Sequence, residues 1–144
     1  MAARAFITGV SGTDLTDDER AFLRDRQPWG FILFKRNVES PEQVIRLVGE
    51  LRASVGRADA PVLIDQEGGR VQRLQPPHWP VYPPGAVFST LYDADKPAGL
   101  EAARLTARLI AADLHDLGIT VDCLPLADVP VPGADAVIGD RAYG

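Results

Sequence analysis

Residues 62–73 read Val62-Leu63-Ile64-Asp65-Gln66-Glu67-Gly68-Gly69-Arg70-Val71-Gln72-Arg73, and the fold prediction starts from them. Three apolar residues give way at once to polar ones, which is typical of a short, fully buried strand that ends in a loop. Asp65 and Glu67 are two residues apart, so an extended backbone would place both carboxylates on one face. The glycine pair that follows allows a tight turn. The stretch therefore predicts a buried strand with a polar site at its C-terminal end.

Strands and helices alternate along the rest of the chain. Apolar runs predict further strands over residues 5–10, 30–34 and 119–124. A capping box of Thr16 and Glu19 opens a helix that ends near Arg26, and Ser40 with Pro41 opens a second one that ends at Gly56. A third, long helix that ends at Gly118 is predicted from one apolar face, made by Leu100, Ala103, Ala107, Ile110, Leu114 and Leu117.

Residues 75–85 contain five prolines, which forbid a regular helix and remove too many backbone donors for a central strand. This segment is predicted to be a long, stiff loop. His78, Trp79 and Tyr82 lie in it. Aromatic side chains can stack on a sugar, but spacing and charge add nothing to that signal, so we expect them to pack the loop onto its own scaffold.

The alternation predicts an α/β fold with a parallel sheet, in which right-handed crossovers place the helices outside. Polar residues follow the strand that ends at Asp65 and also the strand before it, where Lys35-Arg36-Asn37 stand. Both TIM barrels and open doubly wound sheets keep their sites at the C-terminal ends of strands. Periodicity alone leaves both folds open.

Composition excludes several classes of partner. The 144 residues are 46% hydrophobic and carry a net charge of −5, so nucleic acid and anionic membrane surfaces, which need a basic patch, are not expected. Cys123 is the single cysteine, so no intramolecular disulfide can form. The N-terminus has only Arg4 before a short, interrupted apolar run, and no run approaches the roughly 18 apolar residues of a membrane span. A cytoplasmic protein is expected.

Four segments of the chain resemble the family 3 glycoside hydrolases, and specifically the single-domain bacterial β-N-acetylhexosaminidases that act in cell-wall recycling. They are Ile64–Arg73, Gly30–Asn37, Asp122–Val129 and Ile138–Arg141. The resemblance implies a (β/α)₈ barrel, of which this chain would supply roughly the first four βα units. Residues 1–144 would then be the N-terminal half of a single catalytic barrel. Open strand edges would favour association with the missing half or self-association.

The reaction implied by the resemblance is retaining hydrolysis of a terminal β-linked N-acetylglucosamine, without a metal or organic cofactor. Muropeptides or chitooligosaccharides would be the substrates. In this family an aspartate is the nucleophile, and a histidine on a Lys-His-x-Pro-Gly-His-Gly loop serves as acid and base. The chain contains no such histidine motif, and the nucleophile is expected C-terminal to it. The resemblance therefore implies no catalytic residue in this chain.

Substrate-binding residues are carried over by motif position. Asp65 should accept hydrogen bonds from sugar hydroxyls, while Arg73 and Arg141 should donate to sugar oxygens. Arg70 is expected to be structural. Ala142 stands where the resemblance implies a serine, so a minor loop contact made by that serine is not expected here, while the role of Arg141 is retained.

Three alternatives stay open at this point. Arg141 could instead pair only with Asp140 or another loop carboxylate. The protein could bind a sugar without hydrolysing it. It could also be a phosphate-binding α/β enzyme in which Gly68-Gly69-Arg70 cradles an anion, although no helix evidently follows the glycines.

Overall fold

The computed structural model describes residues 2–133 and 135–144, which divide into two compact units. Unit 1 comprises Met1–Ile64 with Leu114–Asp122, and unit 2 comprises Asp65–Asp113 with Cys123–Gly144. Long apolar residues form a core in the first unit, among them Leu23, Phe31, Leu47, Leu51 and Ile64. Among the described residues, no helix combines the length and apolar character that crossing a membrane would require.

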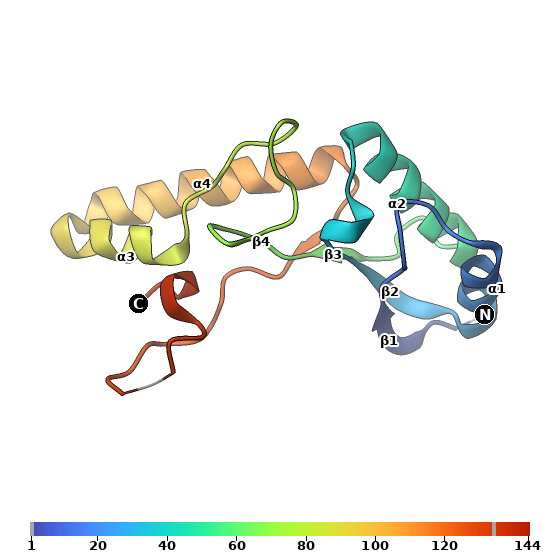
Figure 1. Cartoon of the computed structure of the whole chain (residues 1–144), viewed down its shortest axis with the longest axis horizontal. Helices are drawn as coiled ribbons and strands as arrows, with labels where there is room; N and C mark the ends of the chain where they lie inside the picture. The colour runs from blue at the N-terminus through green and yellow to red at the C-terminus, as the bar shows by residue number, and fades with distance from the viewer. Residues whose placement is uncertain (1, 134) are drawn as a thin grey trace. The chain divides into compact units, whose positions relative to one another are not determined.

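Unit 1 contains a four-stranded parallel sheet with the helices α1 (Asp17–Arg26) and α2 (Pro41–Val55) (Figure 1). Its strands run in the order β1 (Arg4–Thr8), β2 (Pro28–Leu33), β3 (Val62–Ile64) and β6 (Val121–Asp122). The order in the sheet is thus the order along the chain. A doubly wound sheet reverses its strand order at a switch point, whereas a barrel winds in one direction. Strand order therefore favours the barrel, which periodicity could not do.

The ends of both unit 1 helices follow local rules that the sequence predicts. Thr16 and Glu19 form the capping box of α1, and the Ser40 side chain accepts from the backbone of Gln43 at the start of α2. Gly56 ends α2 in the left-handed conformation. Helix α1 ends at Arg26, as predicted. Gln27, with φ of 49°, terminates the helix, and the proline after it already begins β2.

The polar residues after β2 hold a neighbouring loop. Asn37 is fully buried, and its amide donates to the carbonyls of Val10 (3.1 Å) and Gly12 (2.7 Å). Arg36 also donates to the Val10 carbonyl (2.9 Å). These side chains satisfy backbone carbonyls that a loop would otherwise leave unpaired. Their role at the end of this strand is structural.

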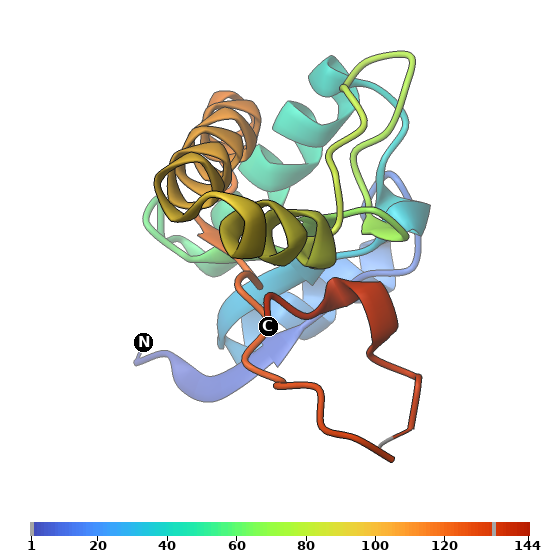
Figure 2. The same cartoon turned by 90° about the vertical axis from the view of Figure 1, so that its left-hand side faces the viewer.

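Unit 2 begins with a β-hairpin that the sequence did not predict. Strands β4 (Gln66–Gly68) and β5 (Val71–Gln72) pair antiparallel around the glycine turn. Gly68 has φ of 90°, and a Cβ there would collide with the Pro83 carbonyl, so the position requires glycine. The loop that follows contains no helix, as predicted, and it returns to the hairpin, where the Gly69 N–H donates to the Tyr82 carbonyl (2.8 Å) (Figure 2).

Two helices follow the loop where one was predicted. They are α3 (Gly85–Ala94) and α4 (Lys96–Asp116), which lie side by side in Figures 1 and 2. Asp95 separates them, and its carboxylate accepts from the backbone of Ala98 in the first turn of α4. A Cβ at Gly99 would stand 2.5 Å from the Tyr92 backbone, so the helices meet through a residue without a side chain.

The predicted apolar face of the long helix is therefore only partly correct. Leu100 is 64% exposed, because the contact with α3 runs through its neighbour Gly99, and Ala107 is also exposed. Ile110 and Leu114 are buried as predicted. The chain ends with a 3₁₀ turn, η2 (Gly139–Arg141), beside α3 in both views.

Candidate functional site: a paired arginine and carboxylate cluster

Asp65 and Arg73 form an ion pair at the start of unit 2. Asp65 directly follows β3 in the chain and Arg73 directly follows β5, so the hairpin between them brings the two side chains together. Arg73 Nη2 donates to Asp65 Oδ2 at 2.6 Å, and the side chains are 25% and 22% exposed. Arg73 Nε is buried and has no hydrogen-bond partner among the described residues. The pair is thus partly accessible and keeps donor capacity unused.

Two buried glutamines fix the backbone that carries Arg73. The Gln66 Oε1 atom accepts from the N–H groups of Arg73 and Leu74, both at 2.9 Å. Gln72 donates to the carbonyls of Leu74 and Pro80, both at 2.7 Å, and accepts from the Tyr82 N–H at 3.0 Å. These side chains make the backbone hydrogen bonds that a neighbouring strand would otherwise make, so the loop is held in one conformation. Neither glutamine could be given a role from its position in the sequence.

Arg141 is held by Glu67. Its Nε donates to Glu67 Oε2 at 2.9 Å and its Nη2 to Oε1 at 2.7 Å, which is the bidentate geometry of a strong ion pair. The Glu67 side chain is 7% exposed and that of Arg141 is 23% exposed. The hydrogen bonds to Glu67 raise the pKa of Arg141 against the opposing effect of burial, and the charges of Asp128 and Asp65 add to the increase. Arg141 therefore lies within electrostatic reach of Asp65, 76 positions earlier.

Arg70 binds the segment that leads into Arg141. Its guanidinium donates to the carbonyls of Val137 (2.6 Å) and Ile138 (2.9 Å) and pairs with Asp140 at 3.2 Å. Three contacts to one loop agree with the structural role expected of Arg70. They also show that Asp140 pairs with Arg70, whereas the carboxylate beside Arg141 is that of Glu67.

The last residues of the chain pack on α3. The Tyr143 ring stacks on Phe88 with centroids 5.8 Å apart, and Ser89 donates to the Tyr143 carbonyl. A Cβ at Gly85 would collide with the Arg141 carbonyl. Ala142 is 2% exposed. The segment around Arg141 is thus fixed on both sides.

The aromatic residues of the proline-rich loop pack the loop, as expected. Trp79 is 7% exposed and Tyr82 is 6% exposed, and the exposed His78 meets the Trp79 ring edge-on. Tyr82 donates its hydroxyl to Asp113 at 2.6 Å. Burial, together with this hydrogen bond, raises the pKa of Tyr82. Neither buried ring offers a free face of the size that sugar stacking needs.

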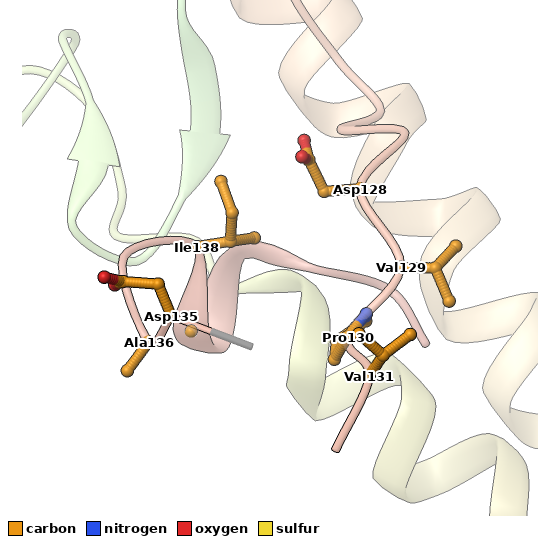
Figure 3. Close-up of a pocket in the computed structure, with 8 residues that line it drawn as sticks. Asp128, Val129, Pro130, Val131, Asp135, Ala136 and Ile138 are labelled. Atoms are coloured by element: carbon orange, nitrogen blue, oxygen red, sulfur yellow. The ribbon is translucent and has the colours of Figure 1, made fainter. Parts of the chain in front are cut away.

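One pocket lies beside the cluster. Figure 3 shows two limbs of the loop after β6, residues 128–131 and 135–139, which together line a volume of about 290 Å³. Asp128 and Asp135 contribute carboxylates from opposite limbs, and the remaining lining residues are Val129, Pro130, Val131, Ala136, Ile138 and Gly139. Asp65, Arg73 and Arg141 do not line this pocket.

The cluster is suited to binding a polar, uncharged ligand. Asp65 and Glu67 balance Arg73 and Arg141, so its formal charge is zero. Both carboxylates are paired with arginines, which leaves neither placed as an unengaged nucleophile. The glycine pair forms a hairpin turn instead of a helix N-terminus, which removes the geometry on which phosphate cradling depended. Within the described residues, no group of three or more histidine, cysteine, aspartate or glutamate side chains could hold a metal ion.

Curated proteins with sequences similar to most of this chain are beta-hexosaminidases. The beta-hexosaminidase of Methylococcus capsulatus is 39% identical over 132 residues, which are 92% of this chain and 37% of that protein. The beta-hexosaminidase of Xanthomonas campestris pv. campestris is 36% identical over 137 residues, which are 95% of this chain and 40% of that protein. The chain thus spans about two fifths of the curated relatives it matches.

Solved structures confirm the predicted architecture. NagZ from Neisseria gonorrhoeae in complex with zinc ion matches with a TM-score of 0.90 and 31% identity, covering 98% of this chain and 42% of that one. The same protein in complex with N-trifluoroacetyl-D-glucosamine matches with a TM-score of 0.89 and 31% identity, covering 98% and 41%. The fold is the α/β fold of the family's TIM barrel, and the barrel is not closed within the described residues. The family model for the glycosyl hydrolase family 3 N terminal domain matches residues 6–144, so the chain belongs to glycosyl hydrolase family 3.

Proposed function

We propose that the protein carrying this chain is a β-N-acetylhexosaminidase, which removes terminal β-linked N-acetylglucosamine by a retaining mechanism. One observation carries the proposal: Asp65, Arg73 and Arg141, the three residues that the family motif assigns to substrate binding, gather in one half-buried cluster of unit 2. Relatives named beta-hexosaminidase, and a relative bound to a glucosamine derivative, support this substrate class.

The chemistry of the cluster assigns a role to each residue. Arg73 donates to Asp65 Oδ2, so Asp65 Oδ1 can accept a hydrogen bond from a sugar hydroxyl. Arg73 and Arg141 retain N–H groups beyond those bonded to carboxylates and can donate to sugar oxygens. Because the cluster has no net charge, a neutral sugar enters without an unbalanced ion. An anionic ligand would lack an excess of positive charge to receive it.

The catalytic groups are proposed to come from outside this chain. Residues 1–144 would be the N-terminal half of a single (β/α)₈ catalytic barrel, and the nucleophile and the histidine loop would belong to the other half. Muropeptides released in cell-wall recycling, or chitooligosaccharides, are the proposed substrates, and the cytoplasm is the proposed location. Pairing of the edge strands β1 and β6 with further strands or with a second copy stays a prediction.

A chimeric enzyme tests the proposal. In it, residues 1–144 replace the matching segment of the Methylococcus capsulatus beta-hexosaminidase, which this chain covers over 37% of its length. The purified chimera is assayed with a chromogenic N-acetyl-β-glucosaminide, beside the isolated 144-residue chain. We expect turnover by the chimera and none by the isolated chain.

The results separate the possible roles. A folded chimera without activity, and without binding of N-acetylglucosamine, would refute the proposed substrate. Hydrolysis by the isolated chain would show that the catalytic groups lie within it, and the search would then begin with Asp65, Glu67, Asp122, Asp128 and Asp140.

A further inference from the structure

Glu67 is a buried carboxylate whose two oxygens face one guanidinium. Its side chain is 7% exposed, and it binds Arg141 through Nε (2.9 Å) and Nη2 (2.7 Å). A buried ionised carboxylate is unfavourable unless a partner neutralises it and fills its acceptor sites. Arg141 does both. The same geometry fixes the plane of the guanidinium, because two parallel hydrogen bonds remove its rotation.

The pair leaves one edge of Arg141 for a ligand. Glu67 engages Nε and Nη2, while Nη1 has no hydrogen-bond partner among the described residues. The Arg141 side chain is 23% exposed, so part of it reaches the surface. The backbone of the segment is fixed independently, since Arg70 binds the carbonyls of Val137 and Ile138. What remains for Glu67 to set is the orientation of the guanidinium itself.

We propose that Glu67 is a positioning residue, which orients the Arg141 guanidinium so that Nη1 donates to an oxygen of the sugar. The inference rests on the proposed function and adds to it a residue that contacts no sugar. The two carboxylates of the motif thus have different roles: Asp65 binds the ligand, and Glu67 binds the arginine. With both oxygens bonded to Arg141, Glu67 is neither an acceptor for the sugar nor a nucleophile.

Kinetics of the chimeric enzyme test this role through a double-mutant cycle. Glu67→Gln keeps the size of the side chain but removes its charge and one acceptor oxygen, so the guanidinium is free to turn. We expect KM to rise about tenfold or more, with a smaller change in kcat. Glu67→Asp keeps the charge on a shorter side chain and should give an intermediate KM. In an Arg141→Lys background, Glu67→Gln should change KM by less than about twofold, because its target is gone.

Glu50→Gln is the matched control, because Glu50 also pairs with an arginine, Arg20, at 2.9 Å and lies in unit 1. It should leave KM unchanged. A structural role for Glu67 predicts a lower melting temperature and a lower yield of active enzyme, with KM unchanged in the molecules that fold. If Glu67→Gln does not fold, Glu67→Asp carries the test.

The outcomes separate this inference from the function on which it rests. Without turnover by the unsubstituted chimera, the proposed function fails. With turnover, a KM that Glu67→Gln and Glu67→Asp leave unchanged overturns the positioning role alone. Equal effects of Glu67→Gln with and without Arg141→Lys overturn it as well, because Glu67 would then act through some other group.

Discussion

Replacing Gln66 with leucine should loosen the loop that carries Arg73. The Gln66 side chain is fully buried, and its Oε1 accepts from the N–H groups of Arg73 and Leu74, both at 2.9 Å. Leucine has a similar volume but no acceptor, so both donors lose their partner. The Leu74 carbonyl also loses the Gln66 amide (3.1 Å), but it keeps Gln72 at 2.7 Å.

The magnitude follows from these contacts. Each buried N–H left unpaired costs about 1–3 kcal/mol, so two cost about 4 kcal/mol at mid-range. Burying the leucine side chain offsets about 2 kcal/mol of this. The remaining loss of about 2 kcal/mol corresponds to roughly 30-fold in the local opening equilibrium. The amides of Arg73 and Leu74 should exchange with solvent faster by that factor.

Hydrogen exchange of these two amides in the chimeric enzyme is the direct assay. KM should rise in parallel, because Arg73 is proposed to contact the substrate. Gln75→Leu is the control, since Gln75 is exposed and its side chain makes one hydrogen bond, to the Gln72 carbonyl at 2.8 Å. It should change exchange by no more than about twofold. Unchanged protection of Arg73 and Leu74 in Gln66→Leu would refute the reasoning.

Three further predictions concern the site, the first helix and association. In the chimera, Asp65→Ala should reduce kcat/KM by about 13- to 160-fold, which corresponds to the about 1.5–3 kcal/mol that hydrogen bonds to a charged acceptor contribute. The control Asp14→Ala, which removes an exposed ion pair with Arg46, should leave kcat/KM unchanged. If Asp65→Ala also leaves kcat/KM unchanged, Asp65 is structural. Burial acts to raise the pKa of Glu19, but hydrogen bonds from Thr16 and Ser11 outweigh it and hold the pKa below 4.5. The capping box should therefore stabilise the fold above about pH 4.5 and lose that effect as the pH falls through the lowered pKa, so the melting temperatures of wild type and Glu19→Gln should converge in acid; a constant difference would contradict this. The isolated chain should sediment as an oligomer or unfold without cooperativity, and a compact monomer with a sharp transition would contradict that expectation.

Local sequence rules were sufficient to predict most helices and strands of unit 1. The capping box at Thr16, the proline after Ser40 and the glycine at position 56 lie where the helices begin and end, because a cap satisfies backbone groups within three or four residues of itself. The apolar runs predict the four parallel strands, since a strand covered on both faces needs apolar residues throughout. Strands β2 and β3 are largely buried in this way, whereas most residues of β1 are exposed. The family motifs also predict a substrate site at Asp65, Arg73 and Arg141, and this assignment stays a prediction.

Two elements were missed, and each depends on distant contacts. The hairpin β4–β5 is only a few residues long and is held by glutamines whose partners lie up to ten positions away. Helix α3 follows a run of prolines, and the break before α4 could have been predicted from Asp95 and Pro97, a cap and a proline in the first turn. The predicted apolar face of the long helix was only partly correct, because a helix can pack through glycine, whereas hydrophobic periodicity counts only large apolar residues.

The partners of the arginines were decided only by tertiary structure. From sequence, Arg141 had its neighbour Asp140 as the obvious carboxylate, yet Asp140 pairs with Arg70, 70 positions away, and Arg141 pairs with Glu67, 74 positions away. The covalent sequence alone determines which charged side chains the protein has. Which opposite charges meet depends on how a hairpin turn and a distant loop are placed against each other, and that placement comes from packing on α3 and from backbone contacts that no local pattern encodes.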